Sequence, residues 1–162
     1  MIELRKITYD NFNQVIDLEV NETQKEFVAS NIYSLAEAYV ALTSNVTTPL
    51  PFGIYAEERL VGFLMLSYDT KNPDEEDDED VYWIWRFMIA KSEQQKGYGK
   101  AAMLKALEYI RTFPLGEATA IVLSYEPSNE VVRKLYASLG FFETGEINDG
   151  EVVAKYDLTK LG

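Results

Sequence analysis

Hydrophobic and polar residues alternate along the first third of the chain in blocks that predict one strand followed by two helices. Residues 2 to 7 alternate apolar and charged side chains, which is typical of a half-buried strand. Residues 11 to 18 instead repeat apolar side chains at a helical spacing. Ser34 and Glu37 have the spacing of a capping box, which predicts a second helix beginning there and ending at about Leu42.

The middle of the chain has strand-like patterns. Residues 52 to 56 and 60 to 67 predict a hairpin with its turn at residues 57 to 59. Residues 81 to 89 predict a long, aromatic-rich strand that contains both tryptophans of the protein.

The second half alternates helical and strand patterns. Gly140 follows the last helical position, where a left-handed C-cap is expected, and the turn at residues 148 to 150 predicts a final hairpin. The elements expected here are a helix at 100–113, a strand at 120–123, a helix at 131–139, and strands at 141–147 and 152–158. The order β-α-α-β-β-β-α-β-α-β-β, without a repeat or linker, predicts one α/β domain over residues 1–162.

The composition restricts the chemistry that this domain can perform. The 162 residues include no cysteine and no histidine. This excludes disulfides, thiolate metal sites, a cysteine nucleophile and the commonest general base, and no metal is expected. Chemistry must therefore use carboxylates, hydroxyls, amines and backbone groups.

The charge favours a cationic ligand. The chain has 27 acidic and 15 basic residues, a net charge of −12, and seven of the acids form the run Asp74 to Asp80. This balance argues against nucleic acid and anionic membrane as partners. The run itself is expected to be a solvated, mobile loop that either attracts a polycation or only aids solubility.

The N-terminal region shows no signal-peptide pattern, and no apolar run approaches the ~18 to 20 residues of a membrane span. We therefore expect a cytoplasmic protein.

A glycine-containing loop separates the aromatic strand from the helix that follows. Its sequence, Gln94 to Lys100, contains Gly97 and Gly99 in a neighbourhood rich in lysine. Glycines allow close backbone approach, and a helix N-terminus attracts anions, so phosphate is the expected ligand. A plain turn is the alternative, since the loop matches neither the Walker A nor the Rossmann pattern.

Asn129 and Tyr136 form a second candidate pair, seven residues apart at the last predicted helix. The tyrosine hydroxyl can donate a proton, and the asparagine can hydrogen-bond an amide-rich ligand. The alternatives are a core tyrosine and an N-cap.

Together these segments resemble the GNAT superfamily of N-acetyltransferases. Gln94-x-x-Gly97-x-Gly99 is similar to its acetyl-CoA signature, and the stretch from Asn129 through Tyr136 to Phe141 is similar to a second family segment. The resemblance implies a central, mixed, mostly antiparallel twisted sheet of about seven strands flanked by four helices. Splayed strands are expected to form the acetyl-CoA cleft.

The resemblance also implies roles for single residues. Phe87, Met88 and Ile89 would bind the pantetheine arm through their backbone, and Asn129 would contact the coenzyme near its thiol. Tyr136 would protonate the departing thiolate. The remaining cofactor-binding residues implied, around the pyrophosphate, are Gln94, Gln95, Lys96, Gly97, Tyr98, Gly99 and Lys100.

Within the superfamily, the chain is most similar to bacterial spermine/spermidine N-acetyltransferases. This implies direct acetyl transfer from acetyl-CoA to a primary amine of a polyamine such as spermine or spermidine. Acetylation of another amine (a protein or peptide, an amino acid or an aminoglycoside) and a non-catalytic acetyl-CoA-binding module are the alternatives, and a homodimer is left open. The stretches that carry this likeness include residues 24–31, 34–39, 51–55, 61–63, 86–87, 145–146 and 150–151.

An amine acceptor must lose a proton before it attacks, and this chain has no histidine to take it. In human-type polyamine acetyltransferases the proposed acid lies on the aromatic strand, where this chain has Trp85, itself a candidate substrate contact. We expect Glu126 to be the base, directly or through water, with an exposed loop acid as the alternative. Candidate contacts for the distal ammonium groups are Glu22, Glu26 and Glu37.

Overall fold

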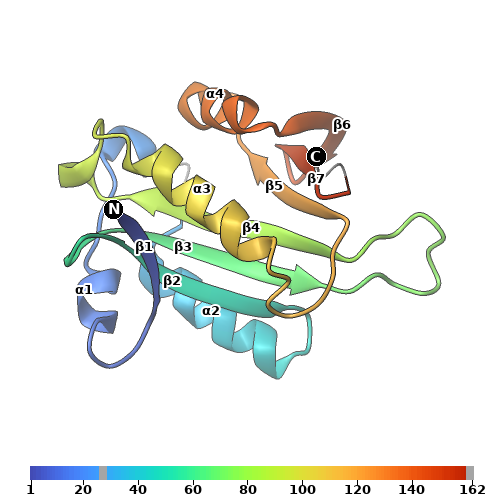
Figure 1. The fold of residues 1–162 in the computed structure, drawn as a ribbon, viewed down its shortest axis with the longest axis horizontal. Coiled ribbons are helices and arrows are strands. Elements are labelled where there is room, and N and C mark those ends of the chain that lie inside the picture. Colours follow the sequence, from blue (N-terminus) through green and yellow to red (C-terminus); the bar gives the residue numbers. More distant parts are fainter. Residues whose placement is uncertain (26–28, 160–162) are drawn as a thin grey trace.

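The computed structural model describes residues 1–25 and 29–159, and Figure 1 shows their arrangement. The helices are α1 (Phe12–Ile16), α2 (Asn31–Thr43), α3 (Tyr98–Ile110) and α4 (Glu130–Leu139), with short 3₁₀ helices at Glu22–Gln24 and Lys91–Glu93. The strands are β1 (Ile2–Lys6), β2 (Thr48–Ala56), β3 (Arg59–Asp69), β4 (Val81–Ile89), β5 (Ala120–Tyr125), β6 (Phe142–Asn148) and β7 (Glu151–Asp157).

The strands form one sheet in the order β1-β2-β3-β4-β5-β7-β6. The pair of β4 and β5 is parallel, and the other neighbours are antiparallel. Over residues 1–25 and 29–159 this confirms the predicted fold class, a mixed and mostly antiparallel sheet of seven strands with four helices. Among the described residues, no helix has the length and apolar composition that crossing a membrane requires.

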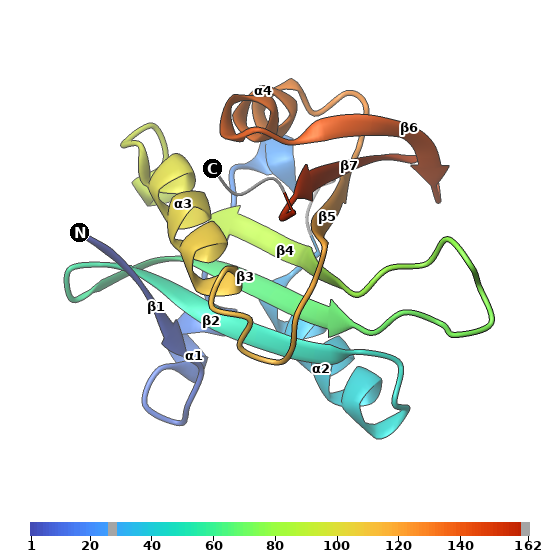
Figure 2. The ribbon, with the colours of Figure 1, turned by 45° about the vertical axis from the view of Figure 1, so that its right-hand side comes forward.

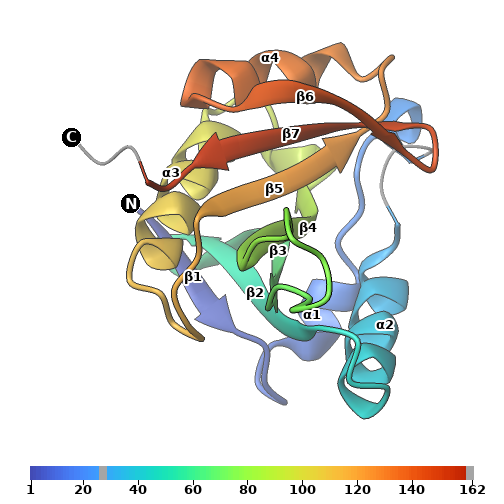
Figure 3. The same ribbon diagram turned by 90° about the vertical axis from the view of Figure 1, so that its right-hand side faces the viewer.

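Helices cover both faces of the sheet, with α1 and α2 on one side and α3 on the other (Figure 3). The larger core lies on the α3 face, where Met103, Ile110 and Tyr136 pack with residues of most strands. A smaller core lies on the opposite face, where Val15 of α1 meets Phe63 and Met65 of β3. The sheet is thus stabilised by apolar burial on both sides.

One interruption in the sheet determines where a ligand can enter. Pairing between β4 and β5 covers Val81 to Trp83 and ends at Trp83 with Val122. Beyond this point β4 and β5 diverge, as Figure 2 shows. The remaining part of β4 therefore keeps β3 as its partner on one side and faces an opening on the other.

The predicted start of the second helix was wrong. The N-cap of α2 is Ser30, whose Oγ accepts a hydrogen bond from the backbone N–H of Tyr33. Ser34 is buried inside the helix, where its hydroxyl donates to the Ser30 carbonyl. The first turn is also held by buried Asn31, which donates to the Val15 carbonyl, so tertiary contact extends the helix beyond the local capping pattern.

Other differences concern element ends. Helix α1 is shorter than the predicted 11–18, and α3 starts and ends earlier than the predicted 100–113. Phe113 adopts a left-handed conformation with φ of 53°, which is incompatible with continuing the helix. Gly140 is left-handed as predicted, with φ of 105°. The final turn is confirmed by Asp149 and Gly150, which both have positive φ.

The acidic run lies in the long connection between β3 and β4, which extends from the body of the protein in Figure 1. Most of its side chains are exposed, as predicted. Three of its carboxylates also make internal bonds: Asp80 and Asp78 each accept a backbone N–H at 2.7 Å, and Glu79 pairs with Lys155 at 3.1 Å. These bonds give the connection defined turns.

Candidate active site

A cavity of about 1090 Å³ lies where β4 and β5 separate. Residues from β3, β4, β5, α3, α4, the glycine loop and the β6–β7 turn line it. The predicted site residues that line it are Trp85, Phe87, Met88, Ile89, Gln94, Gln95, Gly97, Tyr98, Gly99, Glu126, Asn129 and Tyr136. The structure therefore brings together both sequence segments that resemble the family.

The glycine loop leaves space and free backbone donors at one end of this cavity. Gly97 is the N-cap of α3 with φ of 81°, and it supplies no side-chain cap to the first N–H groups of the helix. A Cβ at Gly97 would meet nothing within 4 Å, and one at Gly99 would make only ordinary contacts of 3.8 to 4.0 Å with side chains. Packing within the protein therefore does not require glycine at position 99. Space beside an uncapped helix N-terminus fits a phosphate group.

Strand β4 adds a second set of backbone groups. Its register with β3 shifts so that Met65 faces Arg86 and Leu66 faces Ile84, which leaves Trp85 as an extra residue. Such a bulge bends a strand and re-aims its backbone groups. Together with the missing β5 partner beyond Trp83, the bulge places backbone groups of residues 85–88 along the cavity, in the region that the family resemblance assigns to the pantetheine arm.

Gln94 connects the loop to its surroundings through its side chain. Its Nε2 donates to the Ile89 carbonyl at 2.9 Å and to Gln24 Oε1 at 2.7 Å, and its Oε1 accepts from Asn21 at 2.8 Å. The side-chain amide is thus used within the protein. Gln94 ties the loop to the end of β4 and to the segment before α2.

The lysines near the loop are largely paired with acids. Glu93 is buried and accepts from Lys96 at 2.9 Å and from Arg59 at 2.8 Å. These two cations hold the pKa of the Glu93 carboxyl below its usual value. Lys96 and Lys100, which the sequence placed among the cofactor-binding residues, do not line the cavity. No local pattern in the sequence predicts this buried ion-pair cluster, because Arg59 is 34 residues from Glu93.

Tyr136 lies on α4 with 6% of its surface exposed. Its ring packs between those of Tyr125 and Phe141, each at a centroid distance of 5.8 Å. Burial raises the pKa of Tyr136, and that of Tyr125 is raised to about 12 by burial and by its hydrogen bond to Glu143. Both hydroxyls therefore keep their protons at neutral pH, so a proton is present for donation, while the raised pKa makes each phenol a weaker acid than usual.

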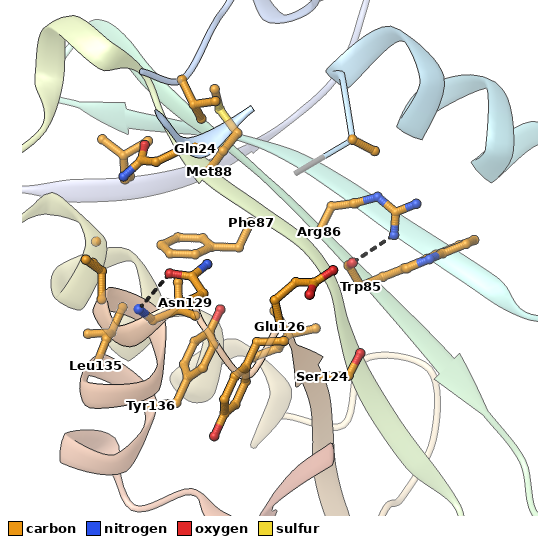
Figure 4. Close-up of a pocket in the computed structure, with 18 of the residues that line it drawn as sticks. Gln24, Trp85, Arg86, Phe87, Met88, Ser124, Glu126, Asn129, Leu135 and Tyr136 are labelled. Carbon is orange, nitrogen blue, oxygen red and sulfur yellow. Dashed lines mark hydrogen bonds between the residues drawn. The ribbon is translucent and has the colours of Figure 1, made fainter. Parts of the chain in front are cut away.

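Asn129 and Glu126 lie beside Tyr136, and Figure 4 shows the three side chains around the same part of the cavity. Asn129 is the N-cap of α4, with its Oδ1 accepting from Val132 N at 3.5 Å. Its amide nitrogen stays available to a ligand. Glu126 is exposed, and its carboxylate points into the space between Tyr136 and β4.

The proposed contacts for distal ammonium groups are placed less favourably. Glu37 does not line the cavity, and its carboxylate pairs with Arg86 at 2.7 Å. Glu22 is exposed and pairs with Lys25. Glu26 lies outside the described residues. Trp85 does line the cavity, and its carbonyl accepts from Arg86 at 3.0 Å (Figure 4).

Several polar residues of the cavity are not predicted from the sequence. They are Ser67 and Asp69 on β3, Ser124 on β5, and Glu151 on β7, whose Oε1 accepts from Ser124 at 2.7 Å. The available signal was weak, because it consists only of polar side chains at alternate positions near a strand end.

Comparison with known proteins defines the class. The model of the acetyltransferase (GNAT) family matches residues 12–141, a span that runs from α1 to α4 and contains most of the cavity wall. The chain therefore belongs to the GNAT acetyltransferase family, as the glycine loop and the fold predicted.

Individual proteins that are similar to this chain include two polyamine acetyltransferases and an aminoglycoside acetyltransferase. A probable spermine N(1)-acetyltransferase of Bacillus subtilis subsp. natto (strain BEST195) is 30% identical over 97% of this chain and 99% of that protein. An aminoglycoside acetyltransferase in complex with coenzyme A has a TM-score of 0.75 at 18% identity, covering 98% of this chain and 96% of the other. A spermidine N-acetyltransferase from Vibrio cholerae, in complex with coenzyme A and spermine, has a TM-score of 0.66 at 18% identity, covering 95% and 92%. The two structural likenesses show the shared fold alone.

Proposed function

We propose that this acetyltransferase transfers the acetyl group of acetyl-CoA directly to a primary amine of a polyamine such as spermine or spermidine. The observation that carries the proposal is one continuous cavity, with backbone donors and an uncapped helix at one end and carboxylates at the other. The first end suits an acyl-CoA and the second suits a cationic amine. The name of the Bacillus subtilis relative supports the same substrate class.

In this proposal, acetyl-CoA supplies an activated acetyl thioester and a thiol leaving group. The first N–H groups of α3, from Gly99 onward, and the backbone of the glycine loop bind the pyrophosphate. The free edge of β4 around Phe87 and Met88 binds the pantetheine arm, and a backbone N–H there donates to the thioester carbonyl as negative charge develops on its oxygen. Asn129 contacts the arm near the sulfur.

The side chains on the opposite wall handle protons. Glu126 takes a proton from the acceptor ammonium, directly or through water, so that the neutral nitrogen attacks the carbonyl carbon as the carbon–sulfur bond breaks. Tyr136 donates its proton to the departing thiolate, and the product nitrogen, still positively charged after the attack, gives its second proton to the tyrosinate directly or through water. This leaves a neutral amide, a thiol and a neutral Tyr136, and the proton on Glu126 passes to solvent. Because a buried phenol is a weaker acid than a thiol of reference pKa ~8.5, close positioning must support the transfer from Tyr136 to the thiolate.

Electrostatics at the acceptor end favour a cation. Glu126 and Glu151 line this end, Asp69 lines the cavity farther along β3, and among the described lining residues the basic side chain is Arg86. The charge of Arg86 is offset by its ion pair with Glu37. An ammonium group entering here thus meets mainly negative charge.

An acceptor panel tests the proposal. Purified protein with acetyl-CoA is assayed for thiol release with spermine, spermidine, putrescine, an aminoglycoside, amino acids and a lysine peptide, and the products are identified by mass spectrometry. We expect the highest kcat/KM with spermine or spermidine. A higher value with another amine would reassign the substrate, and coenzyme binding without release for every amine would support the binding-module alternative.

A further inference from the structure

Two buried polar atoms in the cavity have no partner in the protein. Among the described residues, the buried side-chain nitrogen and oxygen atoms without a hydrogen bond are Asp69 Oδ1 and Arg86 Nε, and both residues line this cavity. Burying a carboxylate oxygen without a donor is unfavourable. Asp69 as a whole is half-buried and lines the cavity, so a ligand N–H group can reach the carboxylate at its other oxygen, or at Oδ1 after the side chain rotates.

The register of the sheet defines the surroundings of Asp69. It is the last residue of β3, and Ser67, two positions earlier on the same face, lies opposite Trp83 of β4. Paired residues project to the same face, so the carboxylate and the indole both belong to the face that α1 and α2 cover. An acid and an aromatic side chain thus line one end of the cavity together.

This end is separate from the part around Tyr136. Phe87 lies beside Asn129 in Figure 4, and it is four positions along β4 from Trp83. At ~3.3 Å per residue this corresponds to about 13 Å along the strand. Glu126 lies near Tyr136, and Asp69 lies beyond Trp83. The cavity therefore has carboxylates at two separated places.

We propose that Asp69, with Trp83 and Ser67, forms a subsite for the distal ammonium group of an extended polyamine whose other primary amine is acetylated. This inference rests on the proposed function and adds the specificity-determining residue. The distal ammonium donates to Asp69 in a charge-assisted hydrogen bond. The indole of Trp83 adds a cation–π contact and covers the methylene chain. An amine without a second ammonium leaves the subsite unused.

The Asp69→Asn variant tests the subsite, with Asp77→Asn in the exposed acidic run as the matched control. Both variants change the net charge equally, and only the first changes the cavity. Loss of a hydrogen bond between charged groups corresponds to about a tenfold or larger change in affinity. We expect Asp69→Asn to raise the KM for spermine by about this factor, with kcat at saturation and the KM for propylamine unchanged. Asp77→Asn should leave all three values near wild type.

Calorimetric titration of spermine into protein saturated with coenzyme A separates this inference from the proposed function. If the wild type binds spermine and Asp69→Asn binds it at least tenfold more weakly, the subsite stands even without turnover. No spermine binding by the wild type, or equal weakening by Asp77→Asn, would overturn it, as would an equal effect on propylamine.

Stability controls exclude a structural role. Because Asp69 Oδ1 has no donor in the protein, Asp69→Asn should not lower the melting temperature. If it does, Trp83→Leu provides the second test. That variant removes the aromatic face and should weaken spermine binding severalfold with no effect on propylamine, and equal binding of spermine by this variant and the wild type would contradict the subsite.

Discussion

The two ends of the cavity are built in different ways. The end that we propose for the coenzyme consists mainly of backbone, supplied by one seven-residue loop, the start of α3 and the free edge of β4. The acceptor end consists of side chains from β3, β4, β5 and β7, which lie far apart in the sequence. One end thus depends on local conformation and the other on how distant strands align.

This difference explains what each end can recognise. Backbone N–H groups are present whatever the side chains are, so the coenzyme end requires mainly glycine, free space and a helix start. The acceptor end requires particular charges at particular positions. Replacing side chains such as Asp69 or Glu151 should therefore change the acceptor that is bound and leave coenzyme binding intact.

Tyr136 lies where the two ends meet, and its replacement is expected to have the largest effect. A general acid contributes about 10²- to 10⁴-fold, so Tyr136→Phe should lower kcat about a thousandfold. The KM for acetyl-CoA should change little, since the proton is needed only as the thiolate departs. Stopped-flow or steady-state thiol release with spermine measures both values.

The matched control is Tyr125→Phe, which changes a neighbouring buried tyrosine that also lines the cavity. Equal losses in the two variants would remove Tyr136 from the acid role. The pH profile adds a second check. Burial raises the pKa of Tyr136, so its proton is retained to higher pH, and wild-type kcat/KM should rise as the amine deprotonates without a falling limb below about pH 10.

The contrast between local conformation and distant contacts also explains which parts of the fold could be predicted from the sequence. The element order, Gly140 and the glycine loop were predictable because each rests on local periodicity or turn chemistry, whereas the mixed sheet was implied by the family resemblance. The start of α2 was not, because the buried Asn31 contact to Val15 extends the helix beyond the local pattern. Tertiary contact here outweighs a capping motif.

The residues of the candidate site likewise fall into those placed by a local motif and those placed by distant contacts. Most of the loop and α4 residues named from the family resemblance line the cavity, since a motif places its own residues together. Asp69 was missed because its role depends on the register of β3 with β4. Glu37 was named as a substrate contact, yet it pairs with Arg86, a contact across 49 residues that no local pattern reveals.

Substitution of Glu126 tests the acceptor end of the cavity without changing the coenzyme end. Glu126→Gln should lower kcat/KM for spermine about a hundredfold, the lower range for a general base, because water still reaches this exposed position. The loss should be greatest at low pH, where the amine is most firmly protonated. The affinity for coenzyme A, measured by calorimetry, should be unchanged.

Glu75→Gln, an equal charge change in the exposed acidic run, is the control for Glu126→Gln and should leave the pH profile at wild type. A wild-type profile for Glu126→Gln as well would assign the proton transfer to water or to another acid of the cavity, of which Glu151 is the nearest candidate along the sheet.

Gly99 tests the coenzyme end alone and should give the smallest effect. A Cβ at this position would touch only side chains, at 3.8 to 4.0 Å, so Gly99→Ala should fold normally and gain up to about 1 kcal/mol in unfolding free energy from helix propensity. A longer side chain would enter the space proposed for the coenzyme. Gly99→Leu should therefore raise the KM for acetyl-CoA about tenfold, as overpacking costs of ~1 to 3 kcal/mol imply, with Gly99→Ala between it and the wild type.

Substitution of Gly99 is thus expected to change stability and coenzyme affinity in opposite directions, and this distinguishes a ligand-binding role from a packing role. If Gly99 were required for packing, its substitution would lower the stability of the protein. Coenzyme binding would then decrease only in proportion to the loss of folded protein. A glycine kept for a ligand should instead show an unchanged or higher melting temperature, a graded loss of coenzyme affinity and an unchanged KM for spermine. If Gly99→Leu weakened spermine and acetyl-CoA equally, the two ends of the cavity would not be separable, and the division between a backbone-built and a side-chain-built end would be wrong.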